Sequence, residues 1–136
     1  MADSTALAEL KESDATGAIA DIYSDIRLSL RVPMVNLIFR HMATVPGCLE
    51  WVWASIGPLY ASGRVVAQAE AMMAERKSVA LDVSADDVAT WGLDAAARDG
   101  VAATCDAYGR ANPANVLGLK ALSFILVQTH LARVVL

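Results

Sequence analysis

Two asparagines are the first candidates for chemistry, because an amide is unusual at the positions they occupy. Asn36 lies three residues after Pro33 on a predicted helix that is otherwise apolar, and Asn112 stands directly before Pro113 between two predicted helices. A buried amide without partners costs about 1–3 kcal/mol, so Asn36 should bond to a specific group. Structural explanations also exist: Asn36 can be a hydrogen-bonding group of the core, and Asn112 can cap a helix that begins with proline.

Arg40 and His41 follow Asn36 by about one turn of the predicted helix and could supply charge to such a site. Either side chain could bond to Asn36, or it could neutralise the carboxylate of a substrate. A lone histidine on an apolar helix is, however, more often a hydrogen-bonded core residue than a ligand, and this holds for His130 as well. Three tryptophans could line a small apolar pocket or belong to the core: Trp51, Trp53 and Trp91.

Several other kinds of chemistry lack the residues that they need. The sequence has no glycine-rich phosphate loop, no G-x-S-x-G, no H-E-x-x-H and no E-x-x-H spacing of a di-iron bundle. Redox chemistry of the alkylhydroperoxidase type would need a C-x-x-C followed by histidine, whereas Cys48 and Cys105 are far apart. We therefore expect neither a metal nor a cofactor. The net charge of −4 lacks the basic footprint of a nucleic-acid-binding protein.

The cysteines and the terminal sequence bear on the compartment. Two lone thiols fit a reducing environment better than one disulfide, which is the alternative. The first residues lack the basic and apolar regions of a secretion signal, and the longest charge-free run, Trp51–Gly63, is too short to span a bilayer. These features predict a soluble, cytoplasmic protein that does not engage membranes.

The elements that must position these residues are helical almost throughout. In the first predicted helix, apolar residues recur at the spacing of one helix face: Ile19, Ile22, Tyr23, Ile26 and Leu30. This helix should end just before Pro33, because a residue that precedes proline is pushed out of the α region. Pro33 suits the first turn of a second, nearly all-apolar helix from Met34 to about Thr44.

Further helices are predicted along the rest of the chain: Cys48 to Ser62 with an irregularity at Gly57-Pro58, Val65 to about Val79, a short helix from the capping box Ser84–Asp87 to Trp91, about Asp94 to Gly109, and a last helix after Asn112-Pro113. Strand signals are scarce. The prediction is therefore a single all-α domain over residues 1–136.

The sequence is more apolar than a typical domain. With glycine counted and tyrosine left out, about 60% of the residues are apolar, against about 45–50% in typical domains. That excess hints at apolar surface beyond what a lone domain needs.

Three stretches carry a resemblance to a known family: Asp25–Pro33, Arg40–Gly47 and Tyr108–Leu117. They resemble the group I 2-haloacid dehalogenases, which act on both D- and L-2-haloacids, and the resemblance covers roughly residues 14–120. Members of that family are all-α and about twice as long, with two similar halves packed as a pseudo-dimer around the active site. The resemblance implies that this chain is a compact multi-helix domain equivalent to one repeat. It also implies that two copies pair as a homodimer.

The resemblance also implies roles for individual residues. In the family, an aspartate from the second half activates a water that displaces halide from the α-carbon, and an asparagine before a proline holds that water. Asn112 occupies the position of that asparagine, and Asn36 occupies the position of the general-base aspartate. The expected substrate contacts are Met34, Leu37, Arg40 and Trp53.

Asn36 is the departure that matters for catalysis. An amide cannot accept a proton near neutral pH, and a general base is commonly worth about 10²–10⁴-fold in rate. Asp106 and Glu50 are the other acids considered, and both could equally be solvated. Three hypotheses follow. The chain is a homodimeric enzyme that converts a short 2-halocarboxylate to the 2-hydroxy acid with inversion, or a non-catalytic relative that binds a small carboxylate or serves assembly, or the first half of a longer product.

Overall fold

The computed structural model describes residues 7–75 and 84–134, apart from the side chains of residues 85, 89 and 129–134. A short 3₁₀ turn, η1 (Glu12–Asp14), precedes six α-helices: α1 (Gly17–Leu30), α2 (Leu37–Met42), α3 (Cys48–Ala61), α4 (Arg64–Ala74), α5 (Ala85–Thr90) and α6 (Ala95–Val134). The described residues form no β-strand, so the all-α prediction is confirmed. Within the same ranges, no helix is long and apolar enough to cross a membrane.

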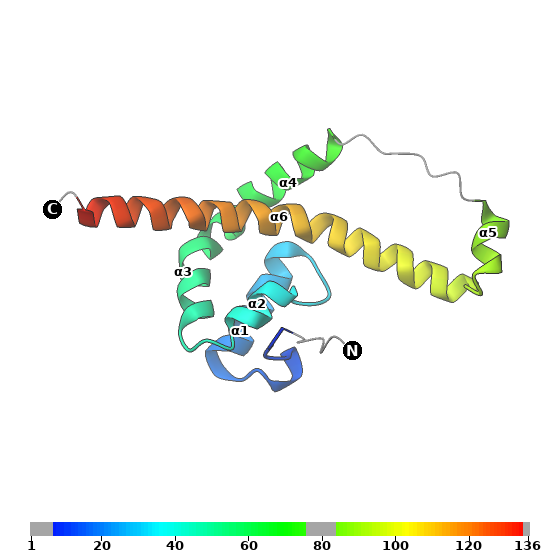
Figure 1. Cartoon of the computed structure of the whole chain (residues 1–136), viewed down its shortest axis with the longest axis horizontal. Coiled ribbons are helices and arrows are strands. Elements are labelled where there is room, and N and C mark those ends of the chain that lie inside the picture. The colour runs from blue at the N-terminus through cyan, green and yellow to red at the C-terminus, as the bar shows by residue number, and fades with distance from the viewer. Residues whose placement is uncertain (1–6, 76–83, 135–136) are drawn as a thin grey trace, which may run out of the picture.

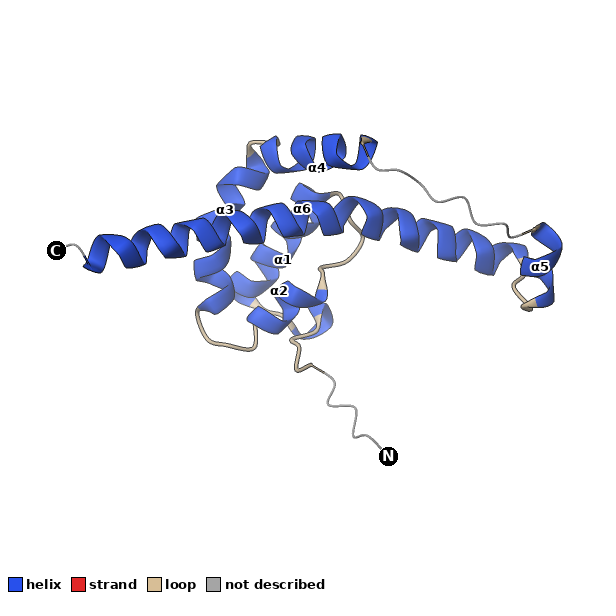
Figure 2. Cartoon of the chain, turned by 45° about the horizontal axis from the view of Figure 1, so that its top comes forward, coloured by secondary structure: helices blue, strands red, loops and turns tan. Residues whose placement is uncertain are grey.

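The long helix α6 organises the molecule. It crosses the whole structure, with α1, α2 and α3 on one side of its middle and α4 along another side (Figures 1 and 2). Both ends of α6 project beyond these helices, and α5 lies at its N-terminal end. The main packing partners of α6 are α4 and α3, and α1 packs mainly on α3.

The core lies among α1, α2, α3, the first half of α4 and the middle of α6. The apolar stripe predicted for the first helix does face this core, because Tyr23, Ile26 and Leu30 are buried. Trp53 is buried as well: its ring stacks on Tyr60 with centroids 5.3 Å apart. Its indole Nε1–H also donates to Asp25 Oδ2 at 2.6 Å. Trp53 therefore belongs to the core, which was one of its two expected roles.

Tyr60 joins α3 to α6 through a close approach at Gly118. The Tyr60 hydroxyl donates to the carbonyl of Ala114 at 3.0 Å, and burial raises the pKa of this phenol. A Cβ at position 118 would overlap the Tyr60 hydroxyl and ring, so only glycine fits here without rearrangement.

The second predicted helix begins later than expected. It was predicted from Met34, but α2 begins at Leu37 with Asn36 as an extended N-cap residue at φ −61° and ψ 145°. The physical reason is a competing bond: the Val35 N–H donates to Glu12 Oε1 at 2.7 Å, which holds the preceding segment outside the helix. Asn36 is therefore at the entrance of α2 rather than on its apolar face.

The break predicted between Gly109 and Asn112 is wrong, because α6 runs unbroken through Pro113. Proline has no N–H to donate to the Gly109 carbonyl, and an interior proline costs a helix about 3 kcal/mol. Ala111 and Ala114 are buried on either side of Pro113, so packing against the neighbouring helices offsets that cost. Asn112 accordingly lies inside a helix and is no N-cap.

The remaining boundaries agree more closely. The helix α3 continues through Pro58, and α4 ends at Ala74, while the last residues predicted for α4, 76–79, lie outside the described residues. The predicted capping box is present: Asp87 Oδ2 accepts from the Ser84 N–H at 2.8 Å and from its hydroxyl at 2.6 Å. These hydrogen bonds lower the pKa of Asp87. Cys48 and Cys105 are free thiols.

Candidate functional site

The two asparagines predicted from the sequence meet in the structure. Asn36 Nδ2 donates to Asn112 Oδ1 at 3.3 Å, which joins the entrance of α2 to the middle of α6. Asn36 is half-buried and Asn112 is exposed. Within the described part of the chain, neither side chain makes a second hydrogen bond. Asn36 Oδ1 and Asn112 Nδ2 are thus an acceptor and a donor available to a water or a ligand.

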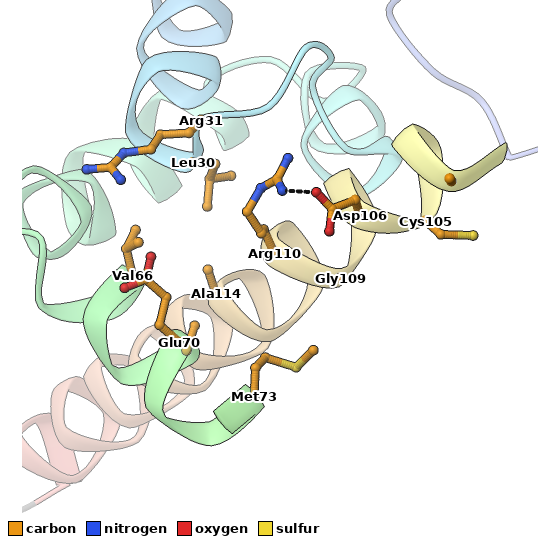
Figure 3. Close-up of a pocket in the computed structure, with 12 residues that line it drawn as sticks. Leu30, Arg31, Val66, Glu70, Met73, Cys105, Asp106, Gly109, Arg110 and Ala114 are labelled. Atoms are coloured by element: carbon orange, nitrogen blue, oxygen red, sulfur yellow. Dashed lines mark hydrogen bonds and ion pairs between the residues drawn. The ribbon is translucent and has the colours of Figure 1, made fainter. Parts of the chain in front are cut away.

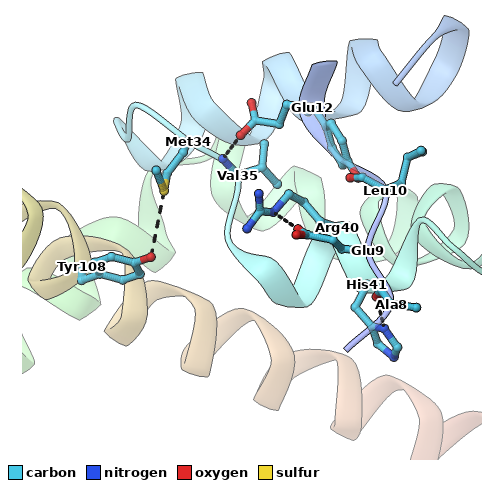
Figure 4. A network of polar contacts seen from close by, with 10 residues as sticks. Ala8, Glu9, Leu10, Glu12, Met34, Val35, Arg40, His41 and Tyr108 are labelled. Carbon is cyan, nitrogen blue, oxygen red and sulfur yellow. Dashed lines mark hydrogen bonds and ion pairs between the residues drawn. The ribbon is translucent and has the colours of Figure 1, made fainter. Parts of the chain in front are cut away.

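Glu12 holds the segment that carries Asn36. Its Oε1 accepts from the Val35 N–H at 2.7 Å, and its Oε2 accepts from Arg27 Nη1, also at 2.7 Å (Figure 4 shows the bond to Val35). One carboxylate therefore ties η1, α1 and the loop before α2 together. This arrangement fixes the backbone one residue before Asn36.

Arg40 and His41 contact the N-terminal segment instead of the asparagines (Figure 4). Arg40 Nε lies 3.1 Å from Glu9 Oε2, an ion pair whose alignment falls short of a hydrogen bond. A backbone hydrogen bond also joins the two segments, because the Leu10 N–H donates to the Arg40 carbonyl at 3.0 Å. His41 Nδ1 lies 2.7 Å from the carbonyl of Ala8, so this ring nitrogen carries the proton. Neither Arg40 nor His41 bonds to Asn36, so the first of their two expected roles is not found. The second role, as a charge for the carboxylate of a substrate, stays a prediction, and the Arg40 guanidinium is already paired with Glu9.

A cavity of about 150 Å³ adjoins Asn36, between the loop before α2 and the N-terminal half of α6. Eight residues line it: Val32, Pro33, Met34, Asn36, Ala103, Thr104, Ala107 and Tyr108. We call this the Asn36 cavity. At its rim the Tyr108 hydroxyl lies 4.0 Å from Met34 Sδ (Figure 4).

Of the four predicted substrate contacts, Met34 alone lines the Asn36 cavity. Leu37 is 45% exposed and does not line it, and Trp53 lies in the core. Six of the eight lining residues were not among the predicted site residues, and Thr104 and Tyr108 are the two of these six with polar side chains. They precede Asn112 by eight and four residues, which places all three on one helix face. The four-residue spacing of these positions is visible in the sequence, but the predicted break before Pro113 separated Asn112 from the helix that carries Thr104 and Tyr108.

The Asn36 cavity has no carboxylate or imidazole among its lining residues. Asp106 lines a different, larger cavity of about 400 Å³ between α4, α6 and the end of α1, where it pairs with Arg110 (Figure 3). Glu50, in the first turn of α3, is half-buried and its Oε2 has no hydrogen-bond partner, but it does not line the Asn36 cavity either. No cluster of three or more potential metal-binding side chains occurs in the described ranges.

Comparison with known proteins gives two relatives. The chain is 31% identical over 96 residues to an (R)-2-haloacid dehalogenase of Pseudomonas putida, a match that covers 66% of this chain and 32% of the relative. It is 44% identical over 45 residues to a configuration-inverting 2-haloacid dehalogenase of Alcaligenes xylosoxydans xylosoxydans, covering 33% of this chain and 15% of the relative. The matched part therefore spans a third or less of each relative.

No family model matches the chain, and no solved structure matches it. The two relatives share one activity in their names, and the match to the first extends over most of this chain. The chain is therefore a distant, partial homologue of 2-haloacid dehalogenases.

Proposed function

We propose that this chain acts in hydrolytic dehalogenation of short 2-haloalkanoic acids, in the manner of the group I enzymes that accept both stereoisomers. A water molecule attacks the α-carbon, the new C–O bond forms as the carbon–halogen bond breaks, and halide leaves with the electron pair. One proton passes to a base, and the product is the 2-hydroxy acid of inverted configuration. The contact between Asn36 and Asn112 beside an apolar cavity is the observation that carries this proposal. The names of the two relatives support it.

Asn112 positions the attacking water in this proposal. Its Nδ2 donors and the Oδ1 acceptor of Asn36 flank the shared hydrogen bond, so a water between them could be held by both amides. Met34 and its neighbours in the Asn36 cavity contact the substrate. The proton acceptor has to come from outside the cavity lining, because the residues there are neutral.

We propose that a second copy of the chain completes the site. The matches span only 32% and 15% of the two relatives, so a single copy corresponds to a minor part of each. A homodimer would place two copies of Asn36 and Asn112 in one assembly. A single, longer polypeptide would instead carry the rest of the site in the same chain. The intact mass of the protein from its native source distinguishes the two arrangements.

Chloride release from D- and L-2-chloropropionate tests the proposed activity. Asn36→Asp removes the donor of the present bond and introduces a carboxylate, which can accept from Asn112 Nδ2 once the Asn112 amide turns over. It should raise the rate by about 10²–10⁴-fold if the missing base is the main deficiency. The double variant Asn36→Asp/Asn112→Ala should lose that gain, because the water is no longer held. Boiled protein is the blank. Absence of chloride above the blank, in the wild type and in Asn36→Asp, contradicts the proposal.

The lack of a proton acceptor among the lining side chains favours a second candidate, a non-catalytic homologue whose amide pair binds the carboxylate of a small ligand. In this case the amide pair would bind a ligand without activating water. The chain would then bind 2-chloropropionate in a ligand-observed NMR experiment, while neither the wild type nor Asn36→Asp would release chloride. Halide release from Asn36→Asp would show instead a site that lacks only its base.

A further inference from the structure

The wall of the Asn36 cavity that faces the loop before α2 is built by α6. Ala103, Thr104, Ala107 and Tyr108 form it, over the two turns that precede Asn112. Ala103 and Ala107 leave the space open, because each contributes only a methyl group. Tyr108 and Met34 face each other at the rim, and each is about half exposed.

The polar groups of this cavity are few and mostly engaged. The Thr104 hydroxyl donates to the Gly100 carbonyl at 2.8 Å, so its proton is directed along the helix. The Tyr108 hydroxyl is directed at the Met34 sulfur. The Asn36 amide is the remaining polar group of the lining, and it carries no charge. A carboxylate or a halide is thus poorly suited to the interior, whereas an alkyl group is well suited to it.

The volume limits that alkyl group. Pockets for drug-sized ligands measure about 300–1,000 Å³, and the Asn36 cavity holds about 150 Å³. A chain of a few carbons therefore fills it. With the alkyl end inside and the amide pair beside it, the α-carbon would lie next to Asn36 and Asn112.

We propose that the Asn36 cavity is the alkyl-chain subsite for the 2-haloalkanoic acid, and that Ala107 and Tyr108 set the chain length it accepts. This inference rests on the proposed function and adds the part of the substrate that is selected. Ala107 sets the depth of the subsite, since any larger side chain there occupies the same space. Tyr108 closes the rim against Met34, so its removal opens the subsite toward solvent.

Dissociation constants for a series from 2-chloropropionate to 2-chlorohexanoate, measured by NMR on the full chain, test this inference. Ala107→Val should weaken binding of 2-chlorohexanoate relative to 2-chloropropionate by about tenfold or more, the discrimination that a methylene gives in an apolar pocket. Tyr108→Ala should change the same ratio in the opposite direction. A loss of stability cannot produce opposite changes in this ratio. Ala96→Val, at an exposed alanine of the same helix, is the matched control and should leave the ratio unchanged.

The outcomes separate this inference from the proposed function. If the wild type binds both acids and neither Ala107→Val nor Tyr108→Ala changes the ratio, the alkyl group binds elsewhere and the proposed function stands. If the wild type binds no 2-chloroalkanoate and neither it nor Asn36→Asp releases chloride, both fail. Tyr108→Ala decides the question alone if Ala107→Val does not fold, which circular dichroism would show.

Discussion

At the scale of single residues, the amide pair depends on a carboxylate that lies outside the cavity. Glu12 accepts from the Val35 backbone and from Arg27, and its side chain is only 22% exposed. A surface ion pair contributes little to stability, with a median of about 0–1 kcal/mol. A hydrogen bond between a backbone amide and a charged group contributes more, about 1.5–3 kcal/mol. The bond to Val35 is therefore the more important of the two for holding Asn36.

Replacing Glu12 should show this dependence. Glu12→Ala removes both bonds, and we expect the free energy of unfolding to fall by about 1–3 kcal/mol. Glu12→Gln keeps a side-chain oxygen for the Val35 N–H and should recover part of the loss. Urea unfolding followed by circular dichroism measures both variants. Asp14→Ala is the control, because Asp14 is exposed in the same short η1 and its side chain bonds only to the adjacent Ser13. Equal stability of Glu12→Ala and Asp14→Ala would contradict this account.

At the scale of elements, the continuity of α6 creates the site. Because the helix does not break before Pro113, Thr104, Tyr108 and Asn112 lie at intervals of four residues on one face. That face meets the loop before α2, where Met34 and Asn36 lie. The same helix must also pack against α3 and α4, and the close contact of Gly118 with Tyr60 belongs to that packing.

Alanine substitutions at two glycines of α6 should have opposite effects. Gly100 is exposed with nothing near its missing Cβ, so Gly100→Ala should stabilise the protein by about 0.5–1 kcal/mol through helix propensity. Gly118→Ala gains the same propensity but overlaps Tyr60, and such overpacking costs about 1–3 kcal/mol, so a net loss is expected.

Thermal unfolding of the two glycine variants compares the gain in helix propensity with the cost of the overlap at Tyr60. Tyr60→Phe in the background of Gly118→Ala should relieve part of the loss, since the hydroxyl is the nearest atom to the new Cβ. A Gly118→Ala variant as stable as Gly100→Ala would show that α3 and α6 do not approach as closely as described.

The elements differ in how far the sequence determines them. The stripe on α1 and the Ser84–Asp87 capping box are local patterns, and both are present as predicted. The start of α2 and the continuity of α6 depend on groups far away in the chain. Glu12 competes for the Val35 amide, and burial on both sides of Pro113 holds α6 together. Local propensity depends on neighbouring residues and includes neither interaction. The sequence could therefore predict that the Asn36 amide needs a hydrogen-bond partner, but not that the partner is Asn112.

At the scale of the whole molecule, the C-terminal part of α6 carries apolar surface away from the core. It projects beyond α3, and Phe124, Leu126 and Val127 are 61%, 49% and 52% exposed (Figure 1). These three residues lie within four positions of one helix end, and large exposed apolar patches mark interaction surfaces on soluble proteins. The apolar excess noted in the sequence is thus located in part on this projecting end. A second copy of the chain, proposed above to complete the site, is the partner for which this surface should be tested.

Sedimentation equilibrium tests this association. We expect the wild type to have the mass of two chains at micromolar concentration, because association would remove the exposed apolar side chains at this end of α6 from water. Phe124→Glu/Val127→Glu should weaken association at least about tenfold, because a charge without a partner is costly to bury, and glutamate keeps the helix. Leu28→Glu, at a residue of α1 that is 75% exposed, is the control and should leave the mass unchanged.

If the site needs two copies, the rate of halide release per chain by Asn36→Asp should fall when the protein is diluted. We expect this fall in the double-glutamate background and not in the Asn36→Asp single variant over the same concentrations. A wild type that stays a single chain at all concentrations would remove the homodimer and direct the search for the missing base to a longer polypeptide.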